Sequence, residues 1–151
     1  MPVVTRRTNE MKFLSLEPEV AGGTGEHTVM DVCTRPPTVT RLYYEFDGWL
    51  GDDILETFPC YIISERLKNK LATTAFTGFA IADVEVTKSG EFEDLHPGRE
   101  LPAFYWLKIT GRAGVDDFGF SEKSTLIISE QVLSLLGEFQ IDNCQVEAYA
   151  P

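Results

Sequence analysis

A segment that begins Ile-Ile-Ser-Glu occurs twice in this chain of 151 residues, starting at Ile62 and again at Ile127. The two copies align without a gap, and a later leucine also matches, Leu71 in the first copy and Leu136 in the second. In each copy the serine is a good helix N-cap, and the glutamate places a carboxylate in the first turn, where the helix dipole favours negative charge. Each copy is therefore predicted to be a strand that runs into a Ser-capped helix.

The repeat extends upstream into a glycine-rich loop that ends in two aspartates. GWLGDD (48–53) corresponds to GRAGVDD (111–117) with one residue inserted, and each loop follows an aromatic strand, YYEF or FYWL. The duplication thus spans approximately 43–87 and 104–150, and each unit reads strand, loop, strand, helix, strand. Units of about 40 residues cannot bury a core alone, so we expect two pseudo-symmetric units that share one core.

The remaining segments complete an α+β fold, a single domain over residues 1–151 with a mixed or antiparallel sheet. MKFLSL (11–16), HTVMDV (27–32) and VTRLYYEF (39–46) predict strands because they are rich in β-branched and aromatic residues. The segment 88–102 mixes charges with glycine and proline and is predicted to be a linker or a long surface loop.

Two further strands are predicted from their apolar pattern. FPCYII (58–63) is a continuous apolar run, which indicates a strand covered on both faces. FAIADVEVT (79–87) alternates apolar and polar residues with one slip, which indicates a single strand with a bulge.

The chain is strongly acidic, with 13 Lys and Arg against 24 Asp and Glu and a formal net charge of −11. Nucleic-acid binding by bulk charge needs a basic stripe, which the chain lacks. No apolar run approaches the length of a spanning helix, and residues 1–12 have no apolar run typical of a signal peptide, so we expect no membrane partner. The three cysteines lack the spacing of a zinc site or a disulfide framework, which favours a cytoplasmic location.

The paired aspartates, Asp52-Asp53 and Asp116-Asp117, are the sharpest candidates for a functional site. If the two loops met, four carboxylates could hold a hard cation such as Ca²⁺ or Mg²⁺. However, neighbouring side chains in extended backbone point apart, and Asp after Gly is typical of a turn. We expect solvated turns without a metal or cofactor, with contact to a partner as the alternative, and nothing in these polar loops predicts burial.

No other residues form a recognisable catalytic constellation. His27 and His96 are far apart in sequence and neither is near a cysteine, and no nucleophile elbow is present. Trp49, within the first glycine-rich loop, has two readings: a core side chain, or an anchor for a protein partner together with the four aspartates.

Six segments of the chain resemble a family of small uncharacterised bacterial cytoplasmic proteins: EPEVAGGTGE, FDGWLGDD, FPCYIISE, TGFAIADVEV, LPAFYWL and LIISEQVLSLL. The two strands that run into Ser-Glu and an amphipathic helix are also similar to predicted immunity proteins of bacterial polymorphic toxin systems. The second resemblance implies a non-enzymatic protein that binds and neutralises a cognate toxin, and it supplies no catalytic residues.

The sequence therefore favours a protein-binding module whose partner is another protein, a basic toxin domain in the reading that the resemblance implies. The alternative is a small-molecule or metal-dependent enzyme built around the Asp-Asp loops.

Overall fold

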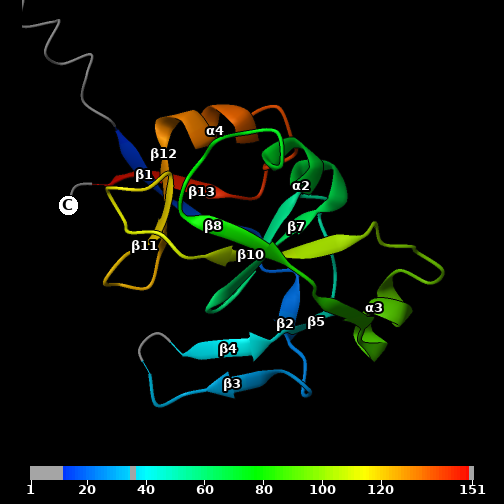
Figure 1. Ribbon diagram of the computed structural model, residues 1–151. Coiled ribbons are helices and arrows are strands. Elements are labelled where there is room, and N and C mark those ends of the chain that lie inside the picture. Colours follow the sequence, from blue (N-terminus) through cyan, green and yellow to red (C-terminus); the bar gives the residue numbers. More distant parts are fainter. Residues whose placement is uncertain (1–11, 35–36, 150–151) are drawn as a thin grey trace, which may run out of the picture.

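A computed structural model describes residues 12–34 and 37–149, and Figure 1 shows the arrangement of its helices and strands. Met11, in the first predicted strand, lies outside the described residues. The helices are α2 (Glu65–Leu71), α3 (Gly90–Leu95) and α4 (Glu130–Leu136). The strands are β1 (Phe13–Glu17), β2 (Gly22–Thr24), β3 (Val29–Asp31), β4 (Thr38–Arg41), β5 (Tyr43–Phe46), β6 (Ile54–Thr57), β7 (Cys60–Ser64), β8 (Phe79–Ala82), β9 (Glu85–Lys88), β10 (Phe104–Ile109), β11 (Phe118–Phe120), β12 (Leu126–Ser129) and β13 (Gln145–Tyr149). Strands outweigh helices, which confirms the α+β prediction at that level.

Two four-stranded antiparallel sheets form the centre of the fold. The first sheet has the order β6-β7-β10-β8 and the second sheet the order β11-β12-β1-β13. In the first sheet Phe104 of β10 lies opposite Ser64, and in the second sheet Phe13 of β1 lies opposite Ser129. The strand from the beginning of the chain therefore completes the sheet formed by the end of the chain.

The expected match between the aromatic strands near Tyr43 and Phe104 is wrong. β5 belongs to a third sheet, β2-β5-β9, whereas β10 lies inside the first sheet between β7 and β8. The corresponding place in the second sheet is taken by β1, because Leu14 and Leu16 of β1 can point into the same core as Leu107 of β10. The local sequence favours β5 as the counterpart of β10, because β5 is the aromatic strand directly before the first glycine-rich loop.

The predicted helix starts are confirmed, since Ser64 and Ser129 each immediately precede a helix in extended N-cap conformation. The Ser129 side chain accepts a hydrogen bond from Val132 N–H, but the Ser64 side chain makes no such cap bond. Leu67 and Leu71 of α2 and three residues of α4 are buried in a cluster between the first and second sheets. Burial of these apolar faces stabilises helices of this length, which are marginal on their own.

β7 is buried on both faces, as its continuous apolar run predicts. Tyr61 and Ile63 point into the cluster between the first and second sheets, whereas Cys60 and Ile62 point into another cluster on the opposite face. The third sheet covers that opposite face through Tyr44 and Phe46 of β5. The first sheet is therefore the middle layer of the molecule.

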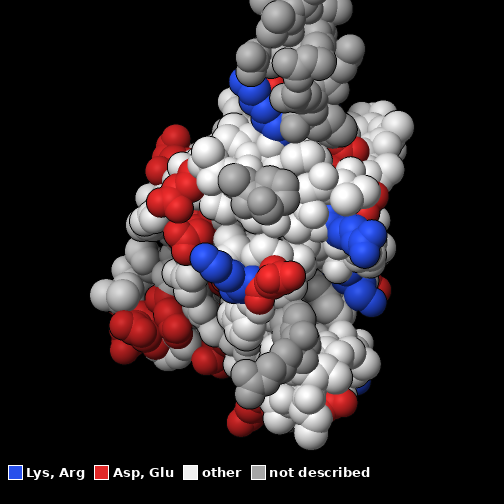
Figure 2. Space-filling view, turned by 90° about the vertical axis from the view of Figure 1, so that its left-hand side faces the viewer, with Lys and Arg blue, Asp and Glu red and all other residues white. Residues whose placement is uncertain are grey.

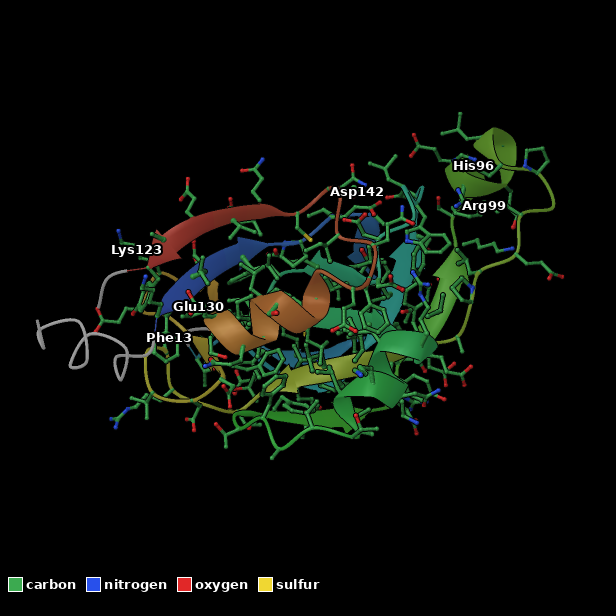
Figure 3. All side chains as sticks on the ribbon, turned by 90° about the horizontal axis from the view of Figure 1, so that it is seen from above. Phe13, His96, Arg99, Lys123, Glu130 and Asp142 are labelled. Atoms are coloured by element: carbon green, nitrogen blue, oxygen red, sulfur yellow. The ribbon has the colours of Figure 1, made fainter. Side chains whose placement is uncertain are left out.

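Two predicted segments are divided differently in the structure. The predicted linker 88–102 contains α3, whose Phe92 is fully buried beside Phe46. The predicted strand 79–87 is two strands in different sheets, with β8 beside β10 and β9 parallel to β5. Figure 3 shows that α3, marked by His96, lies at the opposite end of the molecule from Phe13 and Glu130.

Phe92 provides a test of the packing of α3. Replacing Phe92 by Ala is expected to lower the free energy of unfolding by about 3–5 kcal/mol, because it removes a buried ring and leaves a cavity. Urea denaturation followed by circular dichroism measures this change. The matched control is Leu95→Ala on the same helix, where the side chain is 62% exposed, and its effect should stay within about 0.5 kcal/mol. Equal effects of the two substitutions would contradict the placement of α3.

Candidate functional site

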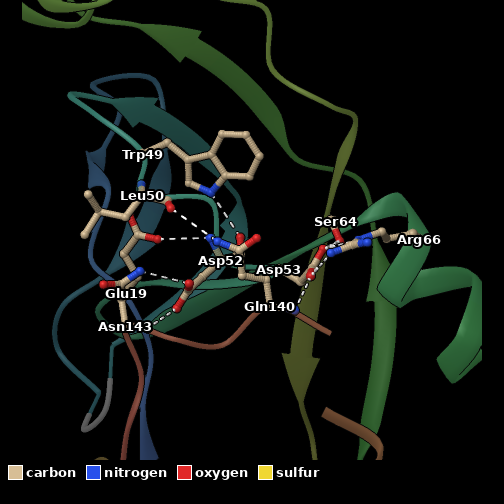
Figure 4. A network of polar contacts seen from close by, with 9 residues as sticks. All are labelled: Glu19, Trp49, Leu50, Asp52, Asp53, Ser64, Arg66, Gln140 and Asn143. Atoms are coloured by element: carbon tan, nitrogen blue, oxygen red, sulfur yellow. Dashed lines mark hydrogen bonds and ion pairs between the residues drawn. The ribbon is translucent and has the colours of Figure 1, made fainter. Parts of the chain in front are cut away.

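The loop between β5 and β6, Asp47 to Asp53, lies where the first and second sheets approach each other, and Figure 4 shows its polar contacts. Trp49 is half-buried in this loop, and its indole N–H donates to the Asp52 carbonyl at 3.0 Å. One edge of its ring meets Phe104, with the ring centroids 5.7 Å apart, and the Arg99 guanidinium lies 4.9 Å from the ring centroid. These contacts favour the core reading of Trp49, with part of the ring left accessible.

Asp52 is fully buried and ties the loop to the end of the chain. Its carboxylate accepts hydrogen bonds from the backbone N–H of Asn143 at 2.9 Å and from the side-chain amide of Asn143 at 3.0 Å. The Cys144 thiol lies 3.7 Å from the same carboxylate, and burial together with the charge of Asp52 raises the pKa of Cys144 to about 12.

Glu19 is a second buried carboxylate beside Asp52. It accepts hydrogen bonds from Leu50 N–H at 2.7 Å and from Asp52 N–H at 3.3 Å. Burial raises the pKa of Glu19 and the negative charge of Asp52 adds to that rise, while the two backbone bonds oppose it. The loop that presents Leu50 is therefore fixed by a carboxylate from the segment between β1 and β2.

Asp53 is 3% exposed and receives four hydrogen bonds. They come from Ser64 Oγ at 2.5 Å, from Arg66 Nε and Nη2 at 2.8 and 2.6 Å, and from Gln140 N–H at 2.8 Å. Burial alone would raise the pKa of Asp53, but the bonds from Arg66, Ser64 and Gln140 and the charge of Arg66 hold it below its ordinary value. Asp53 is thus held as a carboxylate that joins β7, α2 and the segment after α4.

The other pair, Asp116 and Asp117, is half-buried and makes a simpler set of contacts. Asp117 accepts hydrogen bonds from Ser129 Oγ at 2.7 Å and from Thr77 N–H at 3.0 Å. Asp116 accepts Arg112 N–H at 2.8 Å and so closes a local turn, as expected for Asp in a glycine-rich loop. The interactions of Asp117 include no arginine among the described residues.

Asp53 and Asp117 have corresponding hydrogen-bond partners. Each accepts a hydrogen bond from the serine before the helix that follows it, Ser64 or Ser129. Each also accepts a backbone N–H from the segment after the other helix, Gln140 after α4 or Thr77 after α2. The expectation that these loops are solvated is wrong for Asp52 and Asp53, because Gln140 and Asn143 from the far end of the chain cover them.

The paired aspartates do not assemble a site for metal or acid–base chemistry. Among residues 12–34 and 37–149, no group of three or more His, Cys, Asp or Glu side chains is placed to hold a metal ion. The oxygens of Asp52 and Asp53 are occupied by the hydrogen bonds described above, and a partner cannot reach them while they are buried. His27 is exposed, and His96 packs against the ring of Phe92 at 5.3 Å.

An acidic hollow of about 770 Å³ lies beside Leu50. Its charged lining residues are all acidic, and its apolar lining includes two of the most exposed large side chains, Val20 at 68% and Leu50 at 67%. The acidic residues are Glu17, Glu19, Glu56 and Asp142. Figure 3 shows Asp142 at the surface. Figure 2 shows a different face of the molecule, on which acidic side chains gather along one side. Sequence reasoning missed this hollow, because its residues come from three distant segments, 17–20, 50–56 and 142–145, that carry no common motif.

Comparisons with protein-family models, with curated proteins and with solved structures find no match to this chain. Within the part of the chain that the structure describes, no helix is long and apolar enough to cross a membrane.

Asp53 and Asp117 provide a paired test of this network. Asp53→Asn is expected to lower the free energy of unfolding at pH 7 by about 2–3 kcal/mol, because it removes one partner of a buried ion pair whose arginine is partly solvated. Asp117→Asn should lower it by only about 1 kcal/mol, because its partners are neutral donors. Urea denaturation measures both effects, with the exposed Asp83→Asn as control.

The pH dependence of the free energy of unfolding provides a second test of Asp53→Asn. Because the pKa of Asp53 is lower in the folded state, its contribution is complete above an ordinary carboxyl pKa of about 4 and is lost as the pH falls through the folded value. Asp53→Asn should therefore flatten the loss of stability between neutral and acid pH. An acid transition as steep as that of the wild type would contradict the role assigned to Asp53.

Proposed function

We propose that this chain is a non-enzymatic protein-binding module and that its partner is a basic protein. The observation that carries the proposal is the acidic hollow, which Glu17, Glu56 and Asp142 line together with the buried Glu19 and two exposed apolar side chains, Val20 and Leu50. A charged rim around an apolar contact is typical of protein interfaces.

The hollow offers negative charge that the chain itself does not neutralise. No Lys or Arg lines it, and no salt bridge between described residues involves Glu17, Glu56 or Asp142. The pKa of Glu56 is raised by burial and by the negative charge of Glu17, so these carboxylates repel one another. A Lys or Arg side chain entering the hollow would offset that repulsion, and the attraction should also raise the association rate.

Leu50 supports the proposal because its position is fixed before any partner arrives. Its N–H is held by Glu19, and the following residue, Gly51, has a φ of +107°, which favours glycine. Beneath the loop, Trp49 packs against Phe104. An exposed apolar side chain on a fixed loop loses little entropy on binding, which increases the affinity.

The Trp49 loop thus remains part of the proposed contact, but the contacting residues change. Leu50 and the carboxylates of the hollow replace the four aspartates. Asp52 and Asp53 are buried, Asp116 closes its own loop, and Asp117 is bonded to Ser129 and Thr77. The resemblance to immunity proteins favours a toxin domain as the basic partner and the bacterial cytoplasm as the location. An enzyme built on the Asp-Asp loops is not favoured, since those carboxylates are occupied.

The experiment is affinity capture with the tagged chain from a lysate of the source cells, followed by calorimetric titration of the purified partner. Asp142→Lys is expected to weaken binding at least about tenfold, and Leu50→Ala should reduce the binding free energy by about 1–2 kcal/mol. Higher salt should weaken binding of the wild type.

The matched control is Asp94→Lys, which makes the same change of charge at an exposed position on α3. It should leave the affinity unchanged within about twofold. If Asp142→Lys and Leu50→Ala both bind like the wild type, the acidic hollow is not the interface.

A further inference from the structure

The outer edge of β13 is the most open strand edge of the two central sheets. β13 pairs with β1 on one side, and no described residue pairs with its other side. Four of its five residues are exposed, and Val146 is 39% exposed. An unpaired strand edge presents a row of backbone N–H and C=O groups that can accept another strand.

The other three outer strands are less exposed than β13. β6 is bridged by Glu19, which lies opposite Leu55, and β11 is bridged by Arg112, which lies opposite Phe120. β8, which holds the place in the first sheet that β13 holds in the second, is half-buried at three of its four residues. Among the described outer strands, β13 therefore has the most accessible side chains next to an unpaired edge.

The charge along β13 favours a basic strand and opposes a second copy. Glu147 lies at the middle of β13, opposite Ser15 of β1, and Glu17 lies opposite Gln145 on the same face of the sheet. Antiparallel pairing of two β13 strands about their centre would bring the two Glu147 carboxylates together, which is unfavourable. A strand with Lys or Arg at the facing position would instead form a favourable cross-strand pair.

Glu147 lies on this edge strand, and Glu17 lies one strand further in, on β1. Both carboxylates line a hollow of about 880 Å³, and neither forms a salt bridge with a described residue. Arg112 and Lys123 line the same hollow without pairing with either carboxylate. At its other end β13 begins at Gln145, which also lines the acidic hollow with Asp142.

We infer that the basic partner adds a strand to β13, with a Lys or Arg side chain that faces Glu147. This inference rests on the proposed function and deepens it, since it states how the partner docks next to the acidic hollow. Main-chain hydrogen bonds would supply affinity and the alternate side chains would supply specificity, as in other cases of strand addition.

The test uses a capped six-residue peptide of alternating Lys and Val, and the same peptide N-methylated at every residue. N-methylation keeps the charge but removes the N–H groups that a strand pair needs. Binding is measured by fluorescence anisotropy, and amide hydrogen exchange of β13 is followed by NMR. We expect N-methylation to weaken binding at least about tenfold and the unmodified peptide to slow exchange of the free β13 amides.

Glu147→Lys and Asp94→Lys are the paired variants of the protein. Glu147→Lys should weaken binding of the unmodified peptide at least about tenfold, whereas Asp94→Lys should leave it within about twofold. Circular dichroism and urea denaturation check that both variants fold.

Three outcomes would overturn the inference. Equal binding of the N-methylated peptide would show attraction by charge without strand addition, which leaves the proposed function intact. Loss of binding in Asp142→Lys but not in Glu147→Lys would place the basic segment in the acidic hollow alone. A wild-type dimer in sedimentation that protects β13 would make a second copy the occupant. Failure of the proposed function is seen separately, in the titration of the captured partner.

Discussion

The buried carboxylate of Asp53 is the interaction on which the arrangement of the two central sheets depends. It accepts hydrogen bonds from Ser64 of β7, from Arg66 of α2 and from Gln140, which follows α4 near the end of the chain. A buried charge without partners would be strongly unfavourable, so the folded chain can accommodate Asp53 only when all of these segments are in place. Asp117 makes the corresponding hydrogen bonds with Thr77 and Ser129, whose neutral donors bind a carboxylate more weakly than an arginine does. The two carboxylates thus determine where the segment after each helix lies, since each segment donates a backbone N–H to the aspartate of the other loop. Apolar packing alone would not determine these positions.

The two central sheets have corresponding strand orders, but their outer faces differ. The first sheet is covered on its outer face by the third sheet and α3, through Tyr44, Phe46 and Phe92. This covering layer comes from β2 and β5, which lie between β1 and β6 in the chain, and from β9 and α3. The corresponding face of the second sheet carries Ser15, Glu17 and Glu147 beside Ile127 and Tyr149, and among the described residues it lines an open hollow. This hollow favours the second sheet as the surface for the proposed partner.

Several parts of this structure follow from local sequence, and others depend on contacts that sequence reading does not reveal. The Ser-Glu helix starts and the doubly buried β7 could be predicted, because capping residues and a continuous apolar run act within a few positions. The short strands β6 and β11 are not among the strands predicted from the sequence, and their pairing with β7 and β12 makes them strands. The place of β1 beside β12 joins opposite ends of the chain, and no local pattern indicates such a partner. The burial of Asp53 could have been suspected, since in both units a serine at the helix start follows the second aspartate at nearly the same spacing.

Two carboxylates of the acidic hollow, Glu19 and Glu56, link its charge to the stability of the folded chain. Burial raises the pKa of Glu19 and of Glu56, so the folded state holds protons on these groups more tightly than the unfolded state does. Because both pKa values are raised, the free energy of unfolding falls as the pH rises from the ordinary carboxyl pKa to the raised value. The loss is complete once the groups are ionised. Glu19 recovers part of the loss through its bonds to the Trp49 loop, but Glu56 has no charged partner among the described residues. A cation from a partner would lower both pKa values and restore that stability. In the proposed complex, binding of a basic partner would therefore be coupled to the ionisation of these carboxylates.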